Sequence, residues 1–328
     1  MARRRRAAVL AVTGLGLAAI VGLPAAGAQA VGAGGPCGTL GYDSAAPPTY
    51  DHVVLIMDEN LSFKAYTTSS QATFLHGLGA ACGTEQNMHA ATHSSHPNYL
   101  AVSSGVPSQS GHIAADNVFL QADGAGDGWR TYVESMPANC SSAKSTAPLY
   151  KTGHNAAFWY TNLAGSSTSC RTNDLSSVPA LDAAITDDAL PRFSWIVPNL
   201  CNDMHGSTAC TTPTSQRVAQ GDTWMSTWIS KLTAMPSYQA GRTLIVLTWD
   251  EGSGSATVGV DCTSPAYYPS HPDCQIPTIV VSPYVVPGAS DATDHNLCGL
   301  LGTIEDLLGY PRLNAAVGQS SLRPGLGF

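Results

Sequence analysis

Four short runs of apolar and β-branched residues constrain the fold of this chain more than any other feature. They cover residues 52–57, 193–197, 243–249 and 278–282, and each ends where a polar cluster or a proline begins. Runs that are apolar at nearly every position predict central strands covered on both faces, as in a parallel or mixed sheet. We therefore expect these runs to form the core of an α/β domain.

Helical patterns lie between these runs. They cover residues 97–103, 177–185, 223–234 and 297–308, and Gly309 follows the last of them. This alternation predicts helices on both faces of a mostly parallel central sheet, which is a three-layer α/β/α sandwich. Ligands of such sheets bind beyond the carboxyl ends of the strands, where the polar clusters of this sequence fall.

The N-terminus has the pattern of a secretory signal peptide. Arg3 to Arg6 precede an apolar, Gly-containing run over residues 7–24, and the triplet Ala28-Gln29-Ala30 follows. This order predicts cleavage after Ala30 and a secreted, extracellular protein. A membrane anchor is the alternative, but a threonine, three glycines and a proline interrupt the run. The consecutive arginines leave both the Sec and the twin-arginine export routes open.

The predicted mature chain is acidic. Removing residues 1–30 takes away four of the 15 basic residues and none of the 23 acidic ones, which leaves a net charge near −12. This charge argues against wrapping by nucleic acid, and a phosphate would have to meet a local metal ion or helix N-terminus. Residues 31–50 predict a loosely held N-terminal lead-in, and residues 51–328 predict a single domain without an internal repeat.

All nine cysteines follow the predicted cleavage point, and cysteines of an exported chain form disulfides by default. Three pairs would each close a loop rich in Gly, Ser, Thr or Pro, and a fourth would tie down the N-terminal segment: Cys140 with Cys170, Cys201 with Cys210, Cys262 with Cys274, and Cys37 with Cys82. We expect Cys298 to remain unpaired, although the sequence alone does not fix the connectivity. A zinc site is the alternative use of these residues, but there is no Cys-x-x-Cys pair.

Two of the predicted strands end in acidic residues. The first leads into Asp58-Glu59-Asn60, and the run over residues 243–249 leads into Asp250-Glu251. Hard oxygen ligands at a strand end suit a divalent cation, although either cluster alone would also fit a polar turn. Two such strand ends together favour a shared metal site.

A hydroxyl-rich turn precedes the helical pattern that begins at Pro97. We expect Pro97 to be the first helical residue, because its missing N–H is not needed there. The turn would then present Ser95 at a helix N-terminus, where a phosphate or an alkoxide is favoured. The alternative is that Ser94 or Ser95 only caps the helix.

Three further clusters carry residues suited to ligand binding or proton transfer. Asp203 and His205 follow the strand at residues 193–197, and they fit metal ligands or proton donors as well as loop residues held by a disulfide. His154 lies in a separate loop and is open to the same two interpretations. His295 precedes the last predicted helix, so it either caps that helix or faces the site.

Several of these clusters recur in the order of a known family. The blocks are His52 to Phe63, Ser95-x-Pro97-Asn98-Tyr99, Trp249-Asp250-Glu251-Gly252, and Ile276 to Tyr284 with Thr303-Ile304-Glu305-Asp306. In this order they resemble the bacterial and fungal phosphoesterases that include acid phosphatases and non-specific phospholipases C, within the alkaline-phosphatase-like superfamily. His154-Asn155 and residues 198–205 match as well, so the resemblance runs from about residue 50 to 313.

The resemblance implies a fold, a metal and a nucleophile. The metal ligands that it implies are Glu59, Asn60, Ser95, Asp250 and Glu251. The matching blocks also imply substrate contacts for Asn98, Asn199 and Asp203. The turn is similar to the Thr-x-Pro-Asn turn of ectonucleotide pyrophosphatases, which favours Ser95 over Ser94 as the nucleophile. His295 lies farther from the Thr-Ile-Glu block than the family's usual histidine does.

We therefore interpret the chain as a secreted, metal-dependent phosphoesterase that hydrolyses small phosphate monoesters through a phosphoserine intermediate. A metal that holds the Ser95 oxygen would lower its pKa and activate it. His205, His154 or His295 would protonate the leaving alkoxide or steady the phosphoryl oxygens. The oxygen-rich ligand set admits Ca, Mg, Mn, Zn or Fe.

Two other functions share parts of this pattern. A phospholipase C acting on phospholipid head groups would use the same site, and a non-catalytic secreted protein would use the acids to hold a cation. The lack of the C-terminal extension found in larger phospholipases C favours the acid phosphatase-like branch. An acyl-transfer serine hydrolase is disfavoured because the sequence has no Gly-x-Ser-x-Gly elbow.

Overall fold

The structure is a computed structural model that describes residues 35–40, 45–108, 111–143, 148–164, 168–254 and 259–328. These residues belong to one compact unit. The predicted signal peptide and its cleavage point lie outside the described residues, so both stay predictions. No helix in the described part of the chain is long and apolar enough to cross a membrane.

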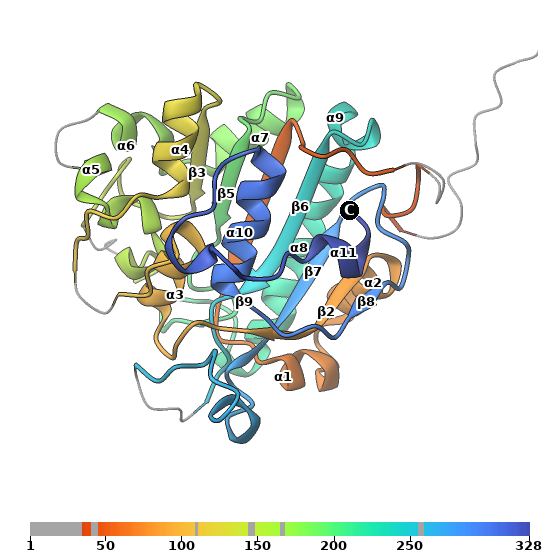
Figure 1. Ribbon diagram of the computed structural model, residues 1–328. Helices are drawn as coiled ribbons and strands as arrows, with labels where there is room; N and C mark the ends of the chain where they lie inside the picture. Colours follow the sequence, from red (N-terminus) through yellow and green to blue (C-terminus); the bar gives the residue numbers. More distant parts are fainter. Residues whose placement is uncertain (1–34, 41–44, 109–110, 144–147, 165–167, 255–258) are drawn as a thin grey trace, which may run out of the picture. The chain divides into compact units, whose positions relative to one another are not determined.

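A nine-stranded sheet lies at the centre of the described residues (Figure 1). Its strands are β1 His52–Asp58, β2 Gly83–His89, β3 Trp129–Val133, β4 Asp174–Leu175, β5 Phe193–Val197, β6 Thr243–Trp249, β7 Gln275–Val281, β8 Ser290–Asp291 and β9 His295–Asn296. Their order is β4-β3-β5-β1-β6-β7-β2-β8, and β9 also pairs with β2. Among these strands only β7 runs antiparallel to its neighbours, β6 and β2. The predicted mostly parallel sheet is confirmed.

Helices cover both faces of this sheet, as predicted: in Figure 1, α10 lies in front of the sheet and α8 behind it. The α-helices are α1 Phe63–Thr68, α2 Thr73–Ala81, α3 Ser95–Ser104, α4 Val118–Ala125, α5 Thr161–Ala164, α6 Thr168–Asn173, α7 Val178–Thr186, α8 Arg217–Thr233, α9 Pro236–Gln239, α10 Leu297–Leu308 and α11 Arg323–Leu326. The three-layer α/β/α sandwich expected from the sequence is therefore present.

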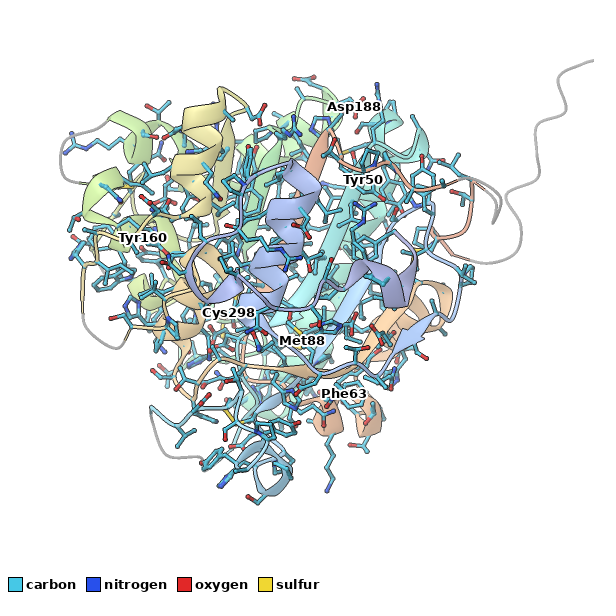
Figure 2. The ribbon with its side chains drawn as sticks, in the orientation of Figure 1. Tyr50, Phe63, Met88, Tyr160, Asp188 and Cys298 are labelled. Atoms are coloured by element: carbon cyan, nitrogen blue, oxygen red, sulfur yellow. A yellow bond between two sulfur atoms is a disulfide. The ribbon has the colours of Figure 1, made fainter. Side chains whose placement is uncertain are left out.

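The centre of the sheet is buried and mostly apolar because β1 and β6 lie between two helical layers. Every residue of β6 is buried, and all of β1 is buried except the partly exposed His52 at its start. Burial of an aliphatic side chain contributes about 1.5–3 kcal/mol, so these strands anchor the layers on both sides. Side chains fill the space between the sheet and the helices throughout the structure (Figure 2).

The beginning of α10 shows how a polar residue sets the start of a buried helix. The Asn296 side chain accepts hydrogen bonds from the N–H groups of Cys298 and Gly299, so Asn296 and not His295 is the cap. The helix ends at Gly309, whose φ of 76° is a left-handed conformation that glycine adopts without strain. The predicted bounds of this helix are confirmed.

Two predicted helix starts differ from the structure. The helix α3 begins at Ser95 and not at Pro97, so the proline is its third residue. Proline is accepted there because the N–H groups of the first turn have no partner within the helix. The helix α8 begins at Arg217, six residues before the predicted start at Thr223, because its first turns are polar and lack an apolar repeat.

Four disulfides confirm the expected pairs and leave Cys298 free. They join Cys37 with Cys82, Cys140 with Cys170, Cys201 with Cys210, and Cys262 with Cys274. Cys298 is buried in α10, and burial raises the pKa of its thiol to about 11. Four disulfides in a chain of this size fit an oxidising, extracellular environment.

This pairing predicts how many thiols can be titrated. The native protein should give almost no reaction with a thiol reagent, because the one free thiol is buried and protonated. After unfolding without reductant, one thiol per chain should react, and Cys298→Ser should remove it. Mass spectrometry after alkylation measures both numbers. Three or more reactive thiols in the unfolded protein would contradict the pairing.

Candidate active site

Three neighbouring parallel strands deliver acidic residues to one edge of the sheet. The register pairs Asp58 at the end of β1 with Trp249 at the end of β6, so the residues that follow, Glu59 and Asp250, emerge side by side. Asp203 comes from the turn after β5, on the other side of β1, and its carbonyl accepts the Glu59 N–H at 2.8 Å. All four carboxylates are fully buried.

The antiparallel strand β7 determines where Ser95 lies. Because β7 reverses direction between β6 and β2, β2 runs in the same direction as β6, and its carboxyl end reaches the same edge. The chain then passes through the turn into α3, whose first residue is Ser95. The Ser95 hydroxyl donates a hydrogen bond to Glu59 Oε2 at 3.1 Å, which joins the predicted nucleophile to the acidic cluster.

Ser95 is not a helix cap. The N-cap position is held by Ser94, whose side chain makes no capping hydrogen bond. Its backbone φ is 148°, a positive value that residues with a side chain rarely adopt. A residue held in such a conformation costs on the order of 1–3 kcal/mol. The Ser94 N–H donates to Glu251 Oε2 at 2.5 Å, so a strong charge-assisted bond holds the strained residue.

Asn98 holds the other side of this turn. Its Oδ1 accepts the N–H groups of Ala91 and Thr92, each at 3.0 Å. Its Nδ2 donates to the carbonyls of Thr92 and Ser94. The side chain is fully buried, and every polar atom of it binds the backbone of the turn. Asn98 therefore positions the turn, and the substrate contact that the resemblance implies for it stays a prediction.

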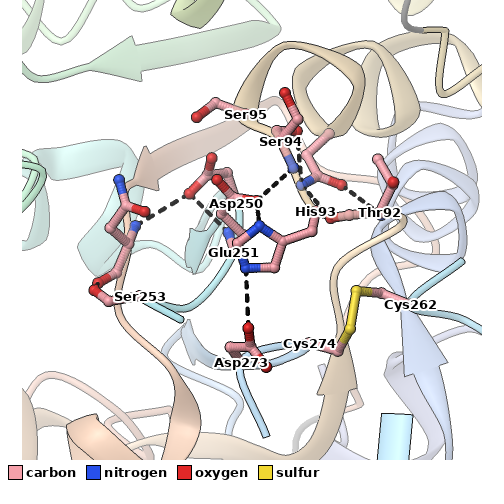
Figure 3. Close-up of polar contacts among 12 residues, drawn as sticks. Thr92, His93, Ser94, Ser95, Asp250, Glu251, Ser253, Cys262, Asp273 and Cys274 are labelled. Atoms are coloured by element: carbon pink, nitrogen blue, oxygen red, sulfur yellow. Dashed lines mark hydrogen bonds and ion pairs between the residues drawn. A yellow bond between two sulfur atoms is a disulfide. The ribbon is translucent and has the colours of Figure 1, made fainter. Parts of the chain in front are cut away.

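His93 joins the turn to two acidic residues (Figure 3). Its Nδ1 lies 3.0 Å from Glu251 Oε2, and its Nε2 lies 3.1 Å from Asp273 Oδ2. The hydrogen bond to Glu251 raises the pKa of His93, so the protonated ring is favoured. Asp273 belongs to the loop closed by the disulfide between Cys262 and Cys274, which therefore supports the site.

Two further histidines lie beside the acids. His154 is buried, with Nε2 3.0 Å from Glu59 Oε1 and Nδ1 3.6 Å from Asp203 Oδ2. Burial, and then the nearby charge of Lys151, lowers the pKa of His154 well below its usual value. The ring of His205 lies 5.9 Å from that of His154, is partly exposed, and bonds through Nδ1 to the Gly206 carbonyl.

The acidic cluster has more negative charge than its protein partners neutralise. Both carboxylate oxygens of Asp58 and Oδ2 of Asp250 are buried without a hydrogen-bond partner. Burial, followed by the charge of Glu251, raises the pKa of Asp250 to about 8. Burial and the charges of its acidic neighbours raise the pKa of Asp58 well above its usual value. Buried carboxylates of this kind are normally paired or bind a metal.

The available oxygen donors fit a hard divalent cation. The carboxylates of Glu59 and Asp250 and the hydroxyl of Ser95 are joined by hydrogen bonds: Ser95 Oγ and Asn60 Nδ2 both donate to Glu59 Oε2, and the Asn60 N–H donates to Asp250 Oδ1. Glu251 belongs to the same group but already accepts bonds from the turn. Oxygen ligands of this type suit Ca, Mg or Mn in particular.

Two predicted site residues lie elsewhere or bind other groups. His295 lies on β9, and its contacts are Glu85 and Asp291 and not the acidic cluster. Asn199 accepts the N–H groups of Cys201 and Asn202 and so holds the turn after β5. Both remain predictions as functional residues.

Sequence reasoning did not single out Asp58, His93 or Asp273. Asp58 directly precedes Glu59, and His93 lies two residues before Ser95. The acidic pair at the strand end and the histidine before the serines were therefore the available signals. Asp273 lies 22 residues after Glu251 in an irregular loop. No local pattern marks it, because only the folded loop brings it to His93.

The family model of the phosphoesterase family matches residues 66–311, which is most of the chain. The chain belongs to the phosphoesterase family. It is therefore a hydrolase that acts on phosphoric ester bonds, and the resemblance read from the sequence blocks is confirmed.

Relatives of known name agree with this membership. The chain is 28% identical to a phosphatidylinositol-3-phosphatase of Mycobacterium tuberculosis, over 84% of this chain and 83% of the relative. It is also 28% identical to an acid phosphatase of Aspergillus fumigatus, over 50% of this chain but only 37% of that protein.

A solved structure supports the fold. A protein of the alkaline phosphatase superfamily from Vibrio parahaemolyticus superimposes with a TM-score of 0.54 at 13% identity, covering 83% of this chain and 69% of the other. The predicted alkaline-phosphatase-like fold is confirmed.

The bonds of Asn98 predict its contribution to stability. Asn98→Ala removes the amide oxygen that accepts two hydrogen bonds from the strained turn and the amide nitrogen that donates two to it. The substitution should lower the free energy of unfolding by about 2–4 kcal/mol. The control is Asn117→Ala, which removes a buried asparagine that caps α4 and should cost only about 1 kcal/mol. Urea unfolding measures both values. Equal losses would show that Asn98 does not hold the turn.

Proposed function

We propose that the protein is a secreted, metal-dependent phosphatase that hydrolyses phosphate monoesters through a phosphoserine on Ser95. The observation that carries this proposal is the 3.1 Å hydrogen bond from the Ser95 hydroxyl to Glu59, within a cluster of buried carboxylates. A serine at the first position of a helix, beside a carboxylate, is a suitable nucleophile for a phosphoryl group.

Glu59, Asp250, Asn60 and Ser95 are the residues that would hold the cation. A bound divalent cation would lower the pKa of the serine hydroxyl and offset the charge of the phosphate. Glu251 acts mainly through the turn, because it accepts the Ser94 N–H and contacts His93. The Ser95 Oγ then forms the new bond to phosphorus while the bond to the leaving alkoxide breaks.

Two histidines have different places in this scheme. His154 is buried between Glu59 and Asp203 and orients the Glu59 carboxylate on the side away from Ser95. His205 is partly exposed, and its Nδ1 is occupied by the Gly206 carbonyl, which leaves Nε2 for a leaving alkoxide or a phosphoryl oxygen. We assign proton donation to His205 and orientation to His154. Nδ1–H of His205 donates to the Gly206 carbonyl, so Nε2 carries a proton to donate only in the protonated ring, and burial lowers the pKa at which that ring forms.

Monoesters are favoured over phosphodiesters as the substrate. The relative that this chain matches over most of its length is named a phosphatidylinositol-3-phosphatase, an activity that removes a terminal phosphate. A phosphorylated lipid head group is therefore the second candidate substrate.

A panel of four substrates separates these possibilities: p-nitrophenyl phosphate, bis-p-nitrophenyl phosphate, phosphatidylcholine, and vesicles carrying phosphatidylinositol 3-phosphate. Faster cleavage of phosphatidylcholine than of the phosphate monoesters would favour a phospholipase C.

Replacement of the nucleophile gives the most direct test. Ser95→Ala should lower kcat for p-nitrophenyl phosphate by at least about 10³-fold, because no other hydroxyl can form the phosphoenzyme. The matched control is Ser94→Ala, which keeps the backbone N–H that binds Glu251 and should retain most of the activity. Acid quenching followed by mass spectrometry should find phosphate on Ser95. A folded Ser95→Ala protein with normal turnover would exclude this mechanism.

Metal removal should affect both activity and stability. A chelator followed by gel filtration should abolish turnover and lower the melting temperature by several degrees, because the buried carboxylates then repel one another. Adding back Ca²⁺, Mg²⁺, Mn²⁺, Zn²⁺ or Fe²⁺ singly identifies the ion that restores both. Full activity in protein that contains no metal by elemental analysis would be incompatible with the proposal.

A further inference from the structure

A second cluster of potential metal ligands lies at the edge of the sheet beyond β7. It consists of Glu85 from β2, Asp291 from β8 and His295 from β9. One ligand atom of each lies within 4.8 Å of the other two. The register explains this meeting, because β8 and β9 both pair with β2 and place Asp291 beside Glu85 and His295 beside Met88.

Glu85 is an unpartnered charge-bearing group inside this cluster. Its side chain is fully buried, and neither carboxylate oxygen has a hydrogen-bond partner. The His295 ring is also buried, and its Nδ1 has no partner either. Burial of an ionised carboxylate without a partner is strongly unfavourable, so Glu85 either carries a proton or binds a cation. This observation is independent of the clustering of the three side chains.

The distances are those of ligands around one ion. His295 Nε2 lies 3.4 Å from Asp291 Oδ2 and 3.9 Å from Glu85 Oε2. A strong hydrogen bond between such charged groups would be about 2.7–2.9 Å long. Ligand atoms at 2.0–2.2 Å from a tetrahedral ion are about 3.3–3.6 Å apart. The 3.4 Å separation falls within this range and the 3.9 Å separation lies just above it, so both are closer to the spacing of ligands around one ion than to that of a direct ion pair.

The surroundings close the cluster on the solvent side. Asp291 Oδ1 accepts two bonds from Thr293, which orients the carboxylate and leaves Oδ2 directed at His295. Gly325 of α11 packs against the same carboxylate, where a Cβ atom would lie 1.9 Å from Asp291 Oδ2. A side chain at position 325 would displace the Asp291 carboxylate, so the backbone of α11 packs directly against that ligand.

We propose that Glu85, Asp291 and His295 form a structural divalent-cation site of the zinc type, separate from the Ser95 site. One imidazole and two carboxylates suit Zn²⁺, whereas Ca²⁺ and Mg²⁺ prefer oxygen ligands only. The ion joins β8 and β9, which are only two residues long, to β2 and so fixes the segment that leads into α10. The role is structural and does not depend on the function proposed for Ser95.

A protonated Glu85 is the competing explanation. Burial, and then the charge of Asp291, raises the pKa of Glu85 to about 8, so without a ligand the group would be neutral at pH 7. In that case Glu85→Gln would be harmless and Zn²⁺ would have no effect at this place. The two explanations therefore predict opposite results in a zinc titration.

The experiment uses the full mature chain with the Ser95 site disabled. The double variant Glu59→Gln, Asp250→Asn is stripped with a chelator, dialysed and titrated with ZnCl₂ alone. We expect about one equivalent of zinc by elemental analysis after gel filtration, and a rise in melting temperature of several degrees. Adding Glu85→Gln or His295→Gln to this background should abolish both, whereas His112→Gln, at an exposed histidine, should change neither.

Two results would overturn the proposal. One is a folded double variant that binds no zinc and shows no shift in melting temperature. The other is zinc binding that persists when His295→Gln is added. If neither added variant folds, Co²⁺ in the double variant decides the question. Four-coordinate cobalt with an imidazole ligand gives an intense visible band, and the absence of such a band would exclude the site.

Discussion

The carboxylates buried at the ends of β1, β5 and β6 are the constraint on which the rest of the structure depends. Asp58, Glu59, Asp203 and Asp250 are fully buried, and their negative charges face one another. Nothing in an apolar interior offsets such a charge, so a fold that keeps these side chains must provide cations or protons. His154 contributes only a hydrogen-bonding contact with Glu59, because burial lowers its pKa and favours the neutral ring. A divalent cation held with Ser95 would offset the negative charge itself.

The same constraint explains why the sheet has its particular topology. Parallel strands bring their carboxyl ends to one edge, so three adjacent strands place acids together that are far apart in the sequence. The proposed nucleophile follows a different strand, and the antiparallel strand β7 allows that strand, β2, to end at the same edge. The two ends of the connection between β6 and β7, at Glu251 and Asp273, then meet at His93, and a disulfide closes the second part of this connection.

Much of this arrangement could be predicted from the sequence. The strands β1, β5, β6 and β7 are apolar at nearly every position, so these runs of apolar residues were enough to predict them. The four disulfide pairs were expected from the loops that each pair would close. The strand β2 was missed because Thr84 to Asn87 are polar, and only pairing with β7 on one side and β8 and β9 on the other makes them a strand.

The candidate site was predicted less completely than the fold. Residues that directly follow a strand, such as Glu59 and Asp250, could be chosen because the strand end itself marks them. The resemblance implies a substrate contact for Asn98, whereas the contacts that it makes with the backbone of the turn depend on a tertiary conformation that no spacing reveals. His295 precedes a helix in sequence, yet the pairing of β9 with β2 directs it to Glu85.

The strain at Ser94 connects the charge of the site to its geometry. A positive φ is unfavourable for serine, and the turn keeps it because Glu251 accepts the Ser94 N–H while Asn98 holds the flanking carbonyls. The same Glu251 oxygen also contacts Nδ1 of His93, which ties the turn to the loop that carries Asp273. The orientation of Ser95 therefore depends on the position of the Glu251 side chain. Loss of that side chain would remove the acceptor that holds Ser94 and release the turn that places the Ser95 hydroxyl beside Glu59.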